Sequence, residues 1–238
     1  MTPDFTALIP VITATWPPVS STEQAGWVIP QGAGGGSRVS AVRWNGAAMT
    51  RQSVETAIAA QAAIGQRPLF IIWPDQTALD SLLDSIGFAE KDPTLAYIAP
   101  IPSLTAPLPP VTTFPTWPPL AIQAEIWADG GIGPARLAVM DRVDGPKTTI
   151  LGRINDRPAA TAFVAVHDGI AMLHALEVAP AARGQGLGRQ MVHAAANWAQ
   201  TQGATHLSLL VTRGNAPANR LYASLGMQVI GYYHYREI

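Results

Sequence analysis

Three alternating glycines stand within the stretch VAPAARGQGLGR, residues 178–189, between the end of an apolar strand-like run and an amphipathic helix pattern. A helix N-terminus presents unpaired N–H groups and the positive end of the helix dipole, and glycine lets a phosphate approach the backbone closely. The stretch therefore predicts a binding site for a pyrophosphate group.

The spacing of these glycines differs from that of two familiar phosphate-binding motifs. The dinucleotide fingerprint needs a third glycine three positions after the second, and here those positions hold Arg189 and Met191. The P-loop needs Gly-Lys followed by Ser or Thr, and the chain contains no such tripeptide. Another glycine-rich run, residues 32–36, precedes no clear helix pattern, so we expect it to form a turn.

The apolar pattern around the loop predicts a mixed α/β fold. Three strand-like runs precede the loop and are separated by turn residues, which is typical of an antiparallel meander. Apolar residues three to four apart then predict a helix from Gly188, with Gly203 as its stop. The expected strands are 68–73, 148–154, 159–167, 170–178, 206–212 and 228–235, and further expected helices are 53–65, 77–86, 120–129 and 216–225.

Seven prolines between residues 102 and 119 forbid a continuous helix or a central strand there. We expect this segment to be a semi-extended linker. It would divide the chain into two domains, residues 1–101 and 120–238.

An internal repeat is a hypothesis that the sequence raises. The segment LLDSIGF at 82–88 lies 139 positions before LYASLGM at 221–227, and at the same offset the strand-like residues 70–73 meet 209–212. Thr-Trp-Pro-Pro also occurs twice, at 15–18 and 116–119, at an offset of 101. A chance recurrence of strand, helix and glycine in an α/β protein is the alternative, and the sequence leaves both open.

Composition excludes several classes of protein. The chain has 238 residues with no cysteine, which removes disulfides, thiolate metal sites and a cysteine nucleophile. The formal charge of −1 supports neither a nucleic-acid nor a membrane partner, and no apolar run is long enough to cross a bilayer. The first residues make a poor secretory signal, so a cytoplasmic protein is expected. No metal site is expected from the spacing of His167, His193, His206 and His234.

The loop and the region after it resemble the Gcn5-related N-acetyltransferase (GNAT) family. The family's loop has Arg or Gln, two residues, Gly, one residue, then Gly or Ala, and Arg183, Gly186 and Gly188 fill these positions. The later segments NAPANRLY at 215–222 and LGM at 225–227 are similar to the family's Asn, helix, Tyr, Leu-Gly-Phe block, with Met in place of Phe. The resemblance covers about residues 120–238.

This resemblance implies an α/β fold with a mixed, largely antiparallel central sheet flanked by helices. Together with the repeat, it implies two GNAT-like halves in tandem, with residues 120–238 as the catalytic domain. Residues 1–101 would be a degenerate half that binds no acetyl-CoA, because they lack the arginine–glycine motif and carry Gln76 and Leu83 where the other half has Asn215 and Tyr222. Many members carry a further strand after the one expected at 228–235, so the completion of that sheet edge is left open.

The resemblance also implies that acetyl-CoA is the co-substrate. The backbone N–H of Val178 would polarise the acetyl carbonyl, and the amides of residues 183–189 would cradle the pyrophosphate. The residues that would bind acetyl-CoA are Leu176, Val178, Arg183, Gly184, Gln185, Gly186, Leu187, Gly188, Arg189, Asn215, Asn219 and Tyr222.

Three residues are candidates for the acid and base chemistry. Tyr222 stands where the family places the acid that protonates the leaving sulfur, although it also fits an aromatic core position. His174 is expected on one strand face with Met172, Leu176 and Val178, and it is either the base or a buried, hydrogen-bonded histidine. Glu177 is the rival base, on the opposite face unless a bulge intervenes. Asn215 fits both a cofactor amide contact and a helix N-cap.

The implied activity is acetyl transfer to a primary amine, of a small molecule or a peptide, by direct attack in a ternary complex. The alternatives are a non-catalytic acyl-CoA-binding or sensing module and a purely structural protein. Monomer and homodimer are both open.

Overall fold

The computed structural model describes residues 2–46 and 49–238, which form an eight-stranded sheet and a three-stranded sheet with helices on both sides. The order is β4-β11-β5-β10-β9-β8-β7-β6 in the large sheet and β1-β2-β3 in the small one. The strands are β1 (Ser20–Gln24), β2 (Trp27–Gln31), β3 (Arg43–Trp44), β4 (Leu69–Ile72), β5 (Ala89–Pro100), β6 (Thr113–Thr116), β7 (Lys147–Ile154), β8 (Arg157–His167), β9 (Ile170–Val178), β10 (His206–Thr212) and β11 (Gln228–Glu237).

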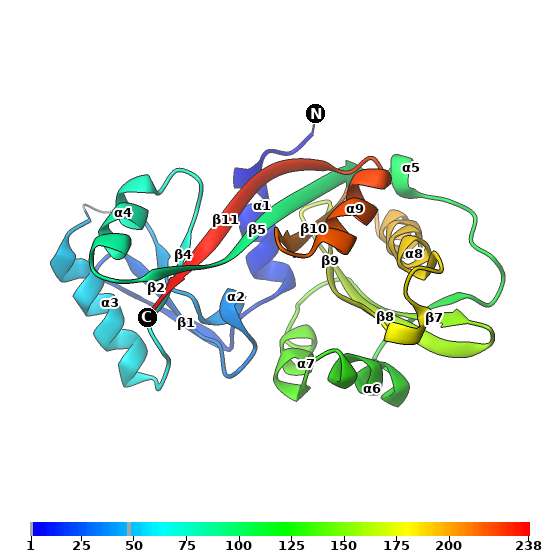
Figure 1. Ribbon diagram of the computed structural model, residues 1–238, viewed down its shortest axis with the longest axis horizontal. Helices are drawn as coiled ribbons and strands as arrows, with labels where there is room; N and C mark the ends of the chain where they lie inside the picture. The colour runs from blue at the N-terminus through cyan, green and yellow to red at the C-terminus, as the bar shows by residue number, and fades with distance from the viewer. Residues whose placement is uncertain (1, 47–48) are drawn as a thin grey trace.

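The described helices cover both faces of the sheets (Figure 1). They are α1 (Phe5–Thr15), α2 (Ser37–Ser40), α3 (Arg51–Ala63), α4 (Thr77–Ser85), α5 (Ile101–Leu104), α6 (Ala121–Asp129), α7 (Pro134–Asp141), α8 (Leu187–Thr201) and α9 (Ala216–Ser224), with a short 3-10 turn at Pro180–Ala182.

The predicted mixed, largely antiparallel α/β sheet is confirmed. β7, β8 and β9 form the expected antiparallel meander, and β10 returns parallel to β9 after the crossover through α8. The other pairings of the large sheet are antiparallel. Each strand and helix expected from the sequence is present, with ends that differ by a few residues.

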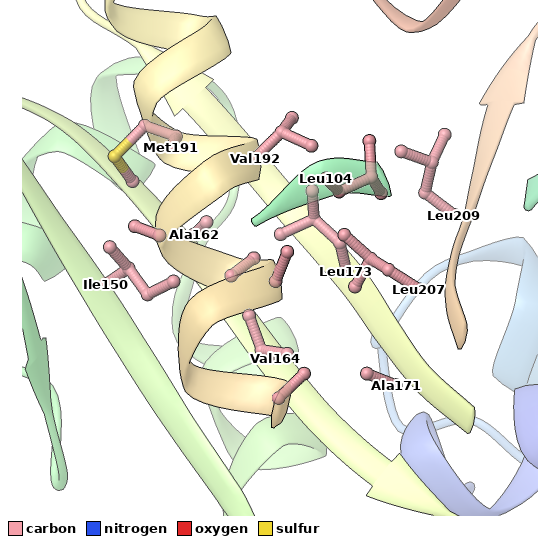
Figure 2. Packing of buried hydrophobic residues seen from close by; sticks show 14 of the residues in the cluster. Leu104, Ile150, Ala162, Val164, Ala171, Leu173, Met191, Val192, Leu207 and Leu209 are labelled. Carbon is pink, nitrogen blue, oxygen red and sulfur yellow. The ribbon is translucent and has the colours of Figure 1, made fainter. Parts of the chain in front are cut away.

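The main core lies between α8 and one face of the large sheet. The residues of α8 that the spacing placed on one face, Met191, Val192 and Ala195 among them, have no measurable exposure. They pack against side chains of β7, β8, β9 and β10 (Figure 2). Burial of each large aliphatic side chain stabilises the fold by roughly 1.5–3 kcal/mol. The packing of α8 on the sheet therefore holds the start of this helix beside the end of β9.

The two halves of the chain exchange strands. β5 lies between β10 and β11, while β11 lies between β5 and β4. The two long strands run side by side across the middle of the molecule (Figure 1). The sheet edge that the sequence left open is therefore completed by β5, a strand from the first half.

The order of elements in the first half matches that of the second. β1, β2 and β3 form an antiparallel series, and a parallel bridge from Val42 to Phe70 connects it to β4, as β10 runs parallel to β9. The offset of 139 residues also relates α4 to α9, and the first residue of β5 to that of β11. These equivalences support the tandem interpretation.

The proline-rich segment differs from the expected linker. Thr113–Thr116 form β6, which pairs with β7 at the edge of the large sheet, and α5 lies at the start of the segment. Pro115 is compatible with this strand because an edge strand hydrogen-bonds on one side only. The division into domains 1–101 and 120–238 stays a prediction, and the structure adds that the two parts share one sheet.

Candidate active site

A β-bulge in β9 opens the large sheet beside β10. Ala175 has a positive φ of 50°, and the register between β8 and β9 shifts between the pairs Thr161–Glu177 and Phe163–His174. The indole Nε1 of Trp127 donates a hydrogen bond of 2.7 Å to the Ala175 carbonyl, which holds the bulge in place. β10 pairs with β9 only as far as Leu209 and Leu173, so the two strands separate beyond that point.

The bulge corrects the strand faces expected from simple alternation. His174 and Glu177 lie opposite Phe163 and Thr161, which share one face of β8, so Glu177 is on the same face as His174. The expectation that Leu176 and Val178 share the face of His174 is wrong, because both pack on the opposite side, against the core under α8. The extra residue of the bulge reverses the alternation.

The backbone of Val178 points into the split between β9 and β10. The Ala179 N–H donates to the Ala159 carbonyl at 2.8 Å, which makes Val178 and Ala160 a non-hydrogen-bonded pair. In such a pair the N–H and C=O groups point away from the partner strand. The Val178 N–H therefore faces the side that β10 has left, as its predicted role in contacting an acyl carbonyl requires.

The glycine loop leaves a row of amides free at the start of α8. No described residue accepts a hydrogen bond from the N–H groups of residues 184–188, and Gly186, the N-cap, has no side chain to do so. Gly184 and Gly186 have φ values of 75° and 84°, a region that favours glycine, with open space where a Cβ would stand. These unpaired amides at the positive end of a 15-residue helix fit a pyrophosphate.

The side chains of the loop point away from its free amides. The Arg183 guanidinium folds back to the Val178 carbonyl and to the Glu177 carboxylate, both at 2.9 Å. Gln185 and Arg189 are exposed and donate to Ala181 and Ser224, whereas Leu187 is buried in the core. A Cβ on Gly188 would lie 3.2 Å from Leu221, so this glycine lets α8 and α9 pack closely.

Tyr222 lies on α9 and is 6% exposed. Its ring centroid is 5.7 Å from that of Tyr97 on β5, and its hydroxyl forms no hydrogen bond with another described residue. Burial, with a smaller contribution from Tyr97, raises the pKa of Tyr222 to about 12. The phenol thus holds its proton at neutral pH, and both the acid role and the core position predicted for it are compatible with this geometry.

The two asparagines have structural partners. The Asn215 side chain caps α9 by accepting from the Ala218 N–H at 3.2 Å. Asn219 accepts from the Tyr97 hydroxyl and donates to three carbonyls at the turn between β10 and α9. Their contacts with acetyl-CoA stay a prediction.

Both ring nitrogens of His174 are engaged. Thr15 Oγ1 donates its proton to the Val11 carbonyl at 2.7 Å, so it accepts from His174 Nε2 at 2.9 Å. Nδ1 then accepts from Arg38 Nη1 at 3.0 Å, because a guanidinium can only donate. Burial and then the charge of Arg38 lower the pKa of His174 well below its ordinary value, so the ring is neutral. This arrangement matches the buried, hydrogen-bonded alternative, and the base role stays a prediction.

A cavity of about 250 Å³ lies where the two halves meet, next to the split. Its walls come from both halves of the chain and include several residues that the sequence did not single out. These lining residues are Trp16, Gly35, Gly36, Ser37, Arg38, Asp92, Thr94, Ile132, Arg136, His174, Ala175, Leu210, Thr212, Tyr233 and Tyr235. The sequence singled out the Thr-Trp-Pro-Pro segment around Trp16 only as part of a repeat, and no local pattern marked Arg38 or Asp92.

Two kinds of feature are absent from residues 2–46 and 49–238. No group of three or more His, Asp or Glu side chains is arranged to hold a metal ion. No helix there combines the length and apolar character that a membrane span requires.

Comparison with known proteins identifies the family. Residues 112–227 match the model of the Acetyltransferase (GNAT) family, and this part of the chain belongs to that family. A relative from Bacillus subtilis (strain 168), the uncharacterized N-acetyltransferase YobR, is 35% identical over 86 residues, which is 35% of this chain and 35% of that protein. The match thus spans about a third of the relative's length.

Solved structures are similar over nearly the whole chain. A GCN5-related N-acetyltransferase from Kribbella flavida has a TM-score of 0.72 at 19% identity, with 96% of this chain and 94% of that chain covered. A tandem GNAT protein from the clavulanic acid biosynthesis pathway has a TM-score of 0.63 at 12% identity, with 96% and 86% covered. At these identities the likeness shows the fold, and it extends to the first half of the chain.

Proposed function

We propose that this protein is an acetyl-CoA-dependent N-acetyltransferase that transfers an acetyl group to a primary amine by direct attack in a ternary complex. The observation that carries the proposal is the junction of two features: the split between β9 and β10, and the unpaired amides of residues 184–188 at its end. An extended chain can lie in the split as an added strand, while a pyrophosphate binds the amides.

The chain supplies separate contacts for the parts of the co-substrate. The loop amides would hold the pyrophosphate, and the edge of β9 at Leu176 and Val178 would pair with the pantetheine amides. Bound acetyl-CoA would supply the acetyl thioester that the amine attacks. The Val178 N–H would donate to the acyl oxygen, where negative charge develops during acyl transfer.

Tyr222 would hold the proton for the leaving thiolate. A phenol whose pKa is about 12 is protonated throughout the neutral range, and its hydroxyl has no competing partner among the described residues. Desolvation keeps this group protonated, because it disfavours the phenolate relative to the phenol.

The attacking amine has to lose a proton. The geometry favours neither of the two bases that the sequence suggested, His174 and Glu177. His174 has both nitrogens engaged, and the Glu177 carboxylate is paired with Arg183 at 2.9 Å. Asp92 lines the cavity, is exposed, and forms no ion pair with another described residue. We assign the proton-accepting role to Asp92, acting through water at the open side of the cavity.

The test is release of free thiol from acetyl-CoA with a panel of primary amines. Tyr222→Phe should lower kcat by roughly 100-fold or more while coenzyme A binding stays within about threefold, because the variant keeps the aromatic ring and loses only the hydroxyl that moves the proton. Tyr97→Phe is the matched control, since it removes the neighbouring hydroxyl, which bonds only to Asn219, and should leave kcat nearly unchanged.

Two outcomes would overturn the proposal. Tight binding of coenzyme A without turnover of any amine would identify a non-catalytic acyl-CoA-binding module instead. A folded protein that takes up no coenzyme A in calorimetry would contradict the co-substrate itself.

A further inference from the structure

The cavity between the halves contains a guanidinium that has no acidic partner. Arg38 Nη1 bonds to His174, Arg38 Cζ lies 5.8 Å from the centroid of the Trp16 ring, and its Nε is buried without a hydrogen-bond partner among the described residues. No described carboxylate lies within 4.0 Å of this side chain, whereas Arg51, Arg153 and Arg183 each have one and Arg236 has two.

The residues around Arg38 favour its charged form, but none of them supplies a negative charge to balance it. Burial acts to lower the pKa of Arg38, but the Tyr233 and Tyr235 hydroxyl groups beside it raise the pKa above its ordinary value. His174 is neutral, and toward Arg38 it acts as a hydrogen-bond acceptor through Nδ1. Burying a charge without a counter-charge is costly, and a ligand that supplies the opposite charge removes that cost.

The cavity contains two further charged side chains, and they also bear on the ligand that it could bind. Arg136 on α7 also lines the cavity without an ion pair to a described residue, and its Nε would lie 3.4 Å from a Cβ on Gly36. Asp92 is the one carboxylate among the lining residues. Two guanidinium groups and one carboxylate complement a molecule that bears an amino group and a negatively charged group.

We propose that the acceptor is a small primary amine that carries a carboxylate, and that the Arg38 guanidinium binds this carboxylate while Asp92 faces the amino group. This inference rests on the proposed acetyl transfer and names its substrate class. The planar guanidinium offers parallel N–H donors that match a carboxylate, and the cavity of about 250 Å³ has aromatic walls at Trp16, Tyr233 and Tyr235.

His174 acquires a positioning role in this arrangement. Its neutral ring is fixed by Thr15 and by stacking against Trp16 at 4.9 Å, and it orients the guanidinium without supplying a counter-charge. A charged histidine at this place would repel Arg38, so the low pKa of His174 keeps the subsite intact.

The experiment compares amines that differ only in the charged group. Phenylalanine, phenylalaninamide and phenethylamine are tested as acceptors with acetyl-CoA, and phenylalanine should have a kcat/KM roughly 10-fold or more above the other two. The amide has the less basic amine, so its larger fraction of free amine works against the expected preference. Arg38→Gln should lower kcat/KM for phenylalanine by roughly 10- to 100-fold and leave the other two within about threefold.

Control variants separate recognition from folding. Arg142→Gln removes another guanidinium whose Nε is buried without a partner, but this residue contacts the Pro17 carbonyl and does not line the cavity, so the preference should persist. Arg38→Lys keeps the charge without the planar fork, and it should retain part of the preference.

Binding provides a readout that does not need turnover. Calorimetry with N-acetylphenylalanine and its amide should show weaker binding of the carboxylate, and not of the amide, to Arg38→Gln. If this holds but no amine is acetylated, the carboxylate subsite stands and the proposed acetyl transfer fails. If amines are acetylated without preference for a carboxylate, or Arg38→Gln lowers all three acceptors equally, the inference is wrong and acetyl transfer stands.

Discussion

Helices α3 and α8 occupy equivalent places in the two halves, and their N-termini are satisfied in different ways. At α3 a capping box closes the end: Thr50 Oγ1 accepts from the Ser53 N–H at 3.1 Å, and Ser53 Oγ accepts from the Thr50 N–H at 3.2 Å. At α8 the N-cap is Gly186, and the preceding amides have no partner among the described residues. One helix end is complete in itself, while the other is open to an anion.

This difference teaches that anion binding is a property of a few loop residues, because the two halves share the same topology. The first half makes a different contribution to the structure. It contributes β5 to the shared sheet, and it supplies Trp16, Arg38 and Asp92 to the cavity beside the split. The comparison therefore separates the half that carries the proposed co-substrate site from the half that lines the proposed acceptor site.

The largest effect is expected where the halves share a strand. Ile98 on β5 has no measurable exposure, and it lies opposite Ser208 of β10 and Gln228 of β11. Ile98→Ala should lower the free energy of unfolding by about 3 kcal/mol through lost contacts and the cavity left behind. Because the strand belongs to both halves, denaturant unfolding should stay a single transition in the wild type and the variant.

The control for this prediction is Val229→Ala on β11, which is 48% exposed and should cost less than about 0.5 kcal/mol. Hydrogen exchange would show whether amides of β2 and β8 lose protection together. Separate unfolding of the first half, with β8 still protected, would contradict the shared-sheet interpretation.

A somewhat smaller effect is expected when a negative charge is placed at the N-terminus of α8. Gly186→Asp places a carboxylate at the cradle and a side chain at a φ of 84°, so the affinity for coenzyme A should fall by roughly 100-fold. Gly203→Asp is the matched control, because Gly203 follows the other end of α8, has a φ of 76° and also has open space at its Cβ. Both variants should lose a similar stability of about 1 kcal/mol. Equal coenzyme A affinity in the two variants, measured by calorimetry, would show that the loop amides at Gly186 do not bind the pyrophosphate.

Local sequence patterns were enough to predict most elements of the second half. The spacing of Met191, Val192 and Ala195 encodes the buried face of α8, and the Asp168-Gly169 turn encodes the hairpin of β8 and β9, because both are contacts between near neighbours in the chain. The glycine loop was recognisable for the same reason. The sequence patterns did not predict α5, α7, β6 or the elements before residue 50. Most of these elements are short, and α1 is interrupted by Pro10, so their periodicity is weak.

The remaining features depend on contacts between distant residues. The β9 bulge requires Trp127, which lies 48 positions before Ala175, and Arg38 meets His174 across 136 positions. The exchange of β5 and β11 joins segments separated by more than 100 residues. No local pattern reports such pairings, so the faces of Leu176 and Glu177 and the identity of the cavity walls could not be predicted.

The smallest effect concerns the ion pairs that tie β11 to the first half. Asp80 on α4 accepts from Arg236 at 2.7 Å and from His234 at 2.8 Å. Burial acts to raise the pKa of Asp80, but the bonds from Arg236 and His234 outweigh it, and the pKa lies below its ordinary value of 3.8. A carboxyl whose folded-state pKa is depressed adds stability above the unfolded value, and this contribution is lost as the pH falls through the folded value.

Asp80→Asn should therefore lower the free energy of unfolding by about 1 kcal/mol near neutral pH, and the difference from the wild type should vanish on acidification to about pH 2. Asp84→Asn is the control, because Asp84 bonds the same arginine from a side chain that is 68% exposed, and it should cost less. Parallel pH profiles for wild type and Asp80→Asn, recorded by denaturant unfolding from about pH 2 to about pH 7, would show that this anchor adds no pH-dependent stability. Coenzyme A binding should be unchanged in both variants, since the anchor stabilises the exchanged strand far along the sheet from the open end of α8.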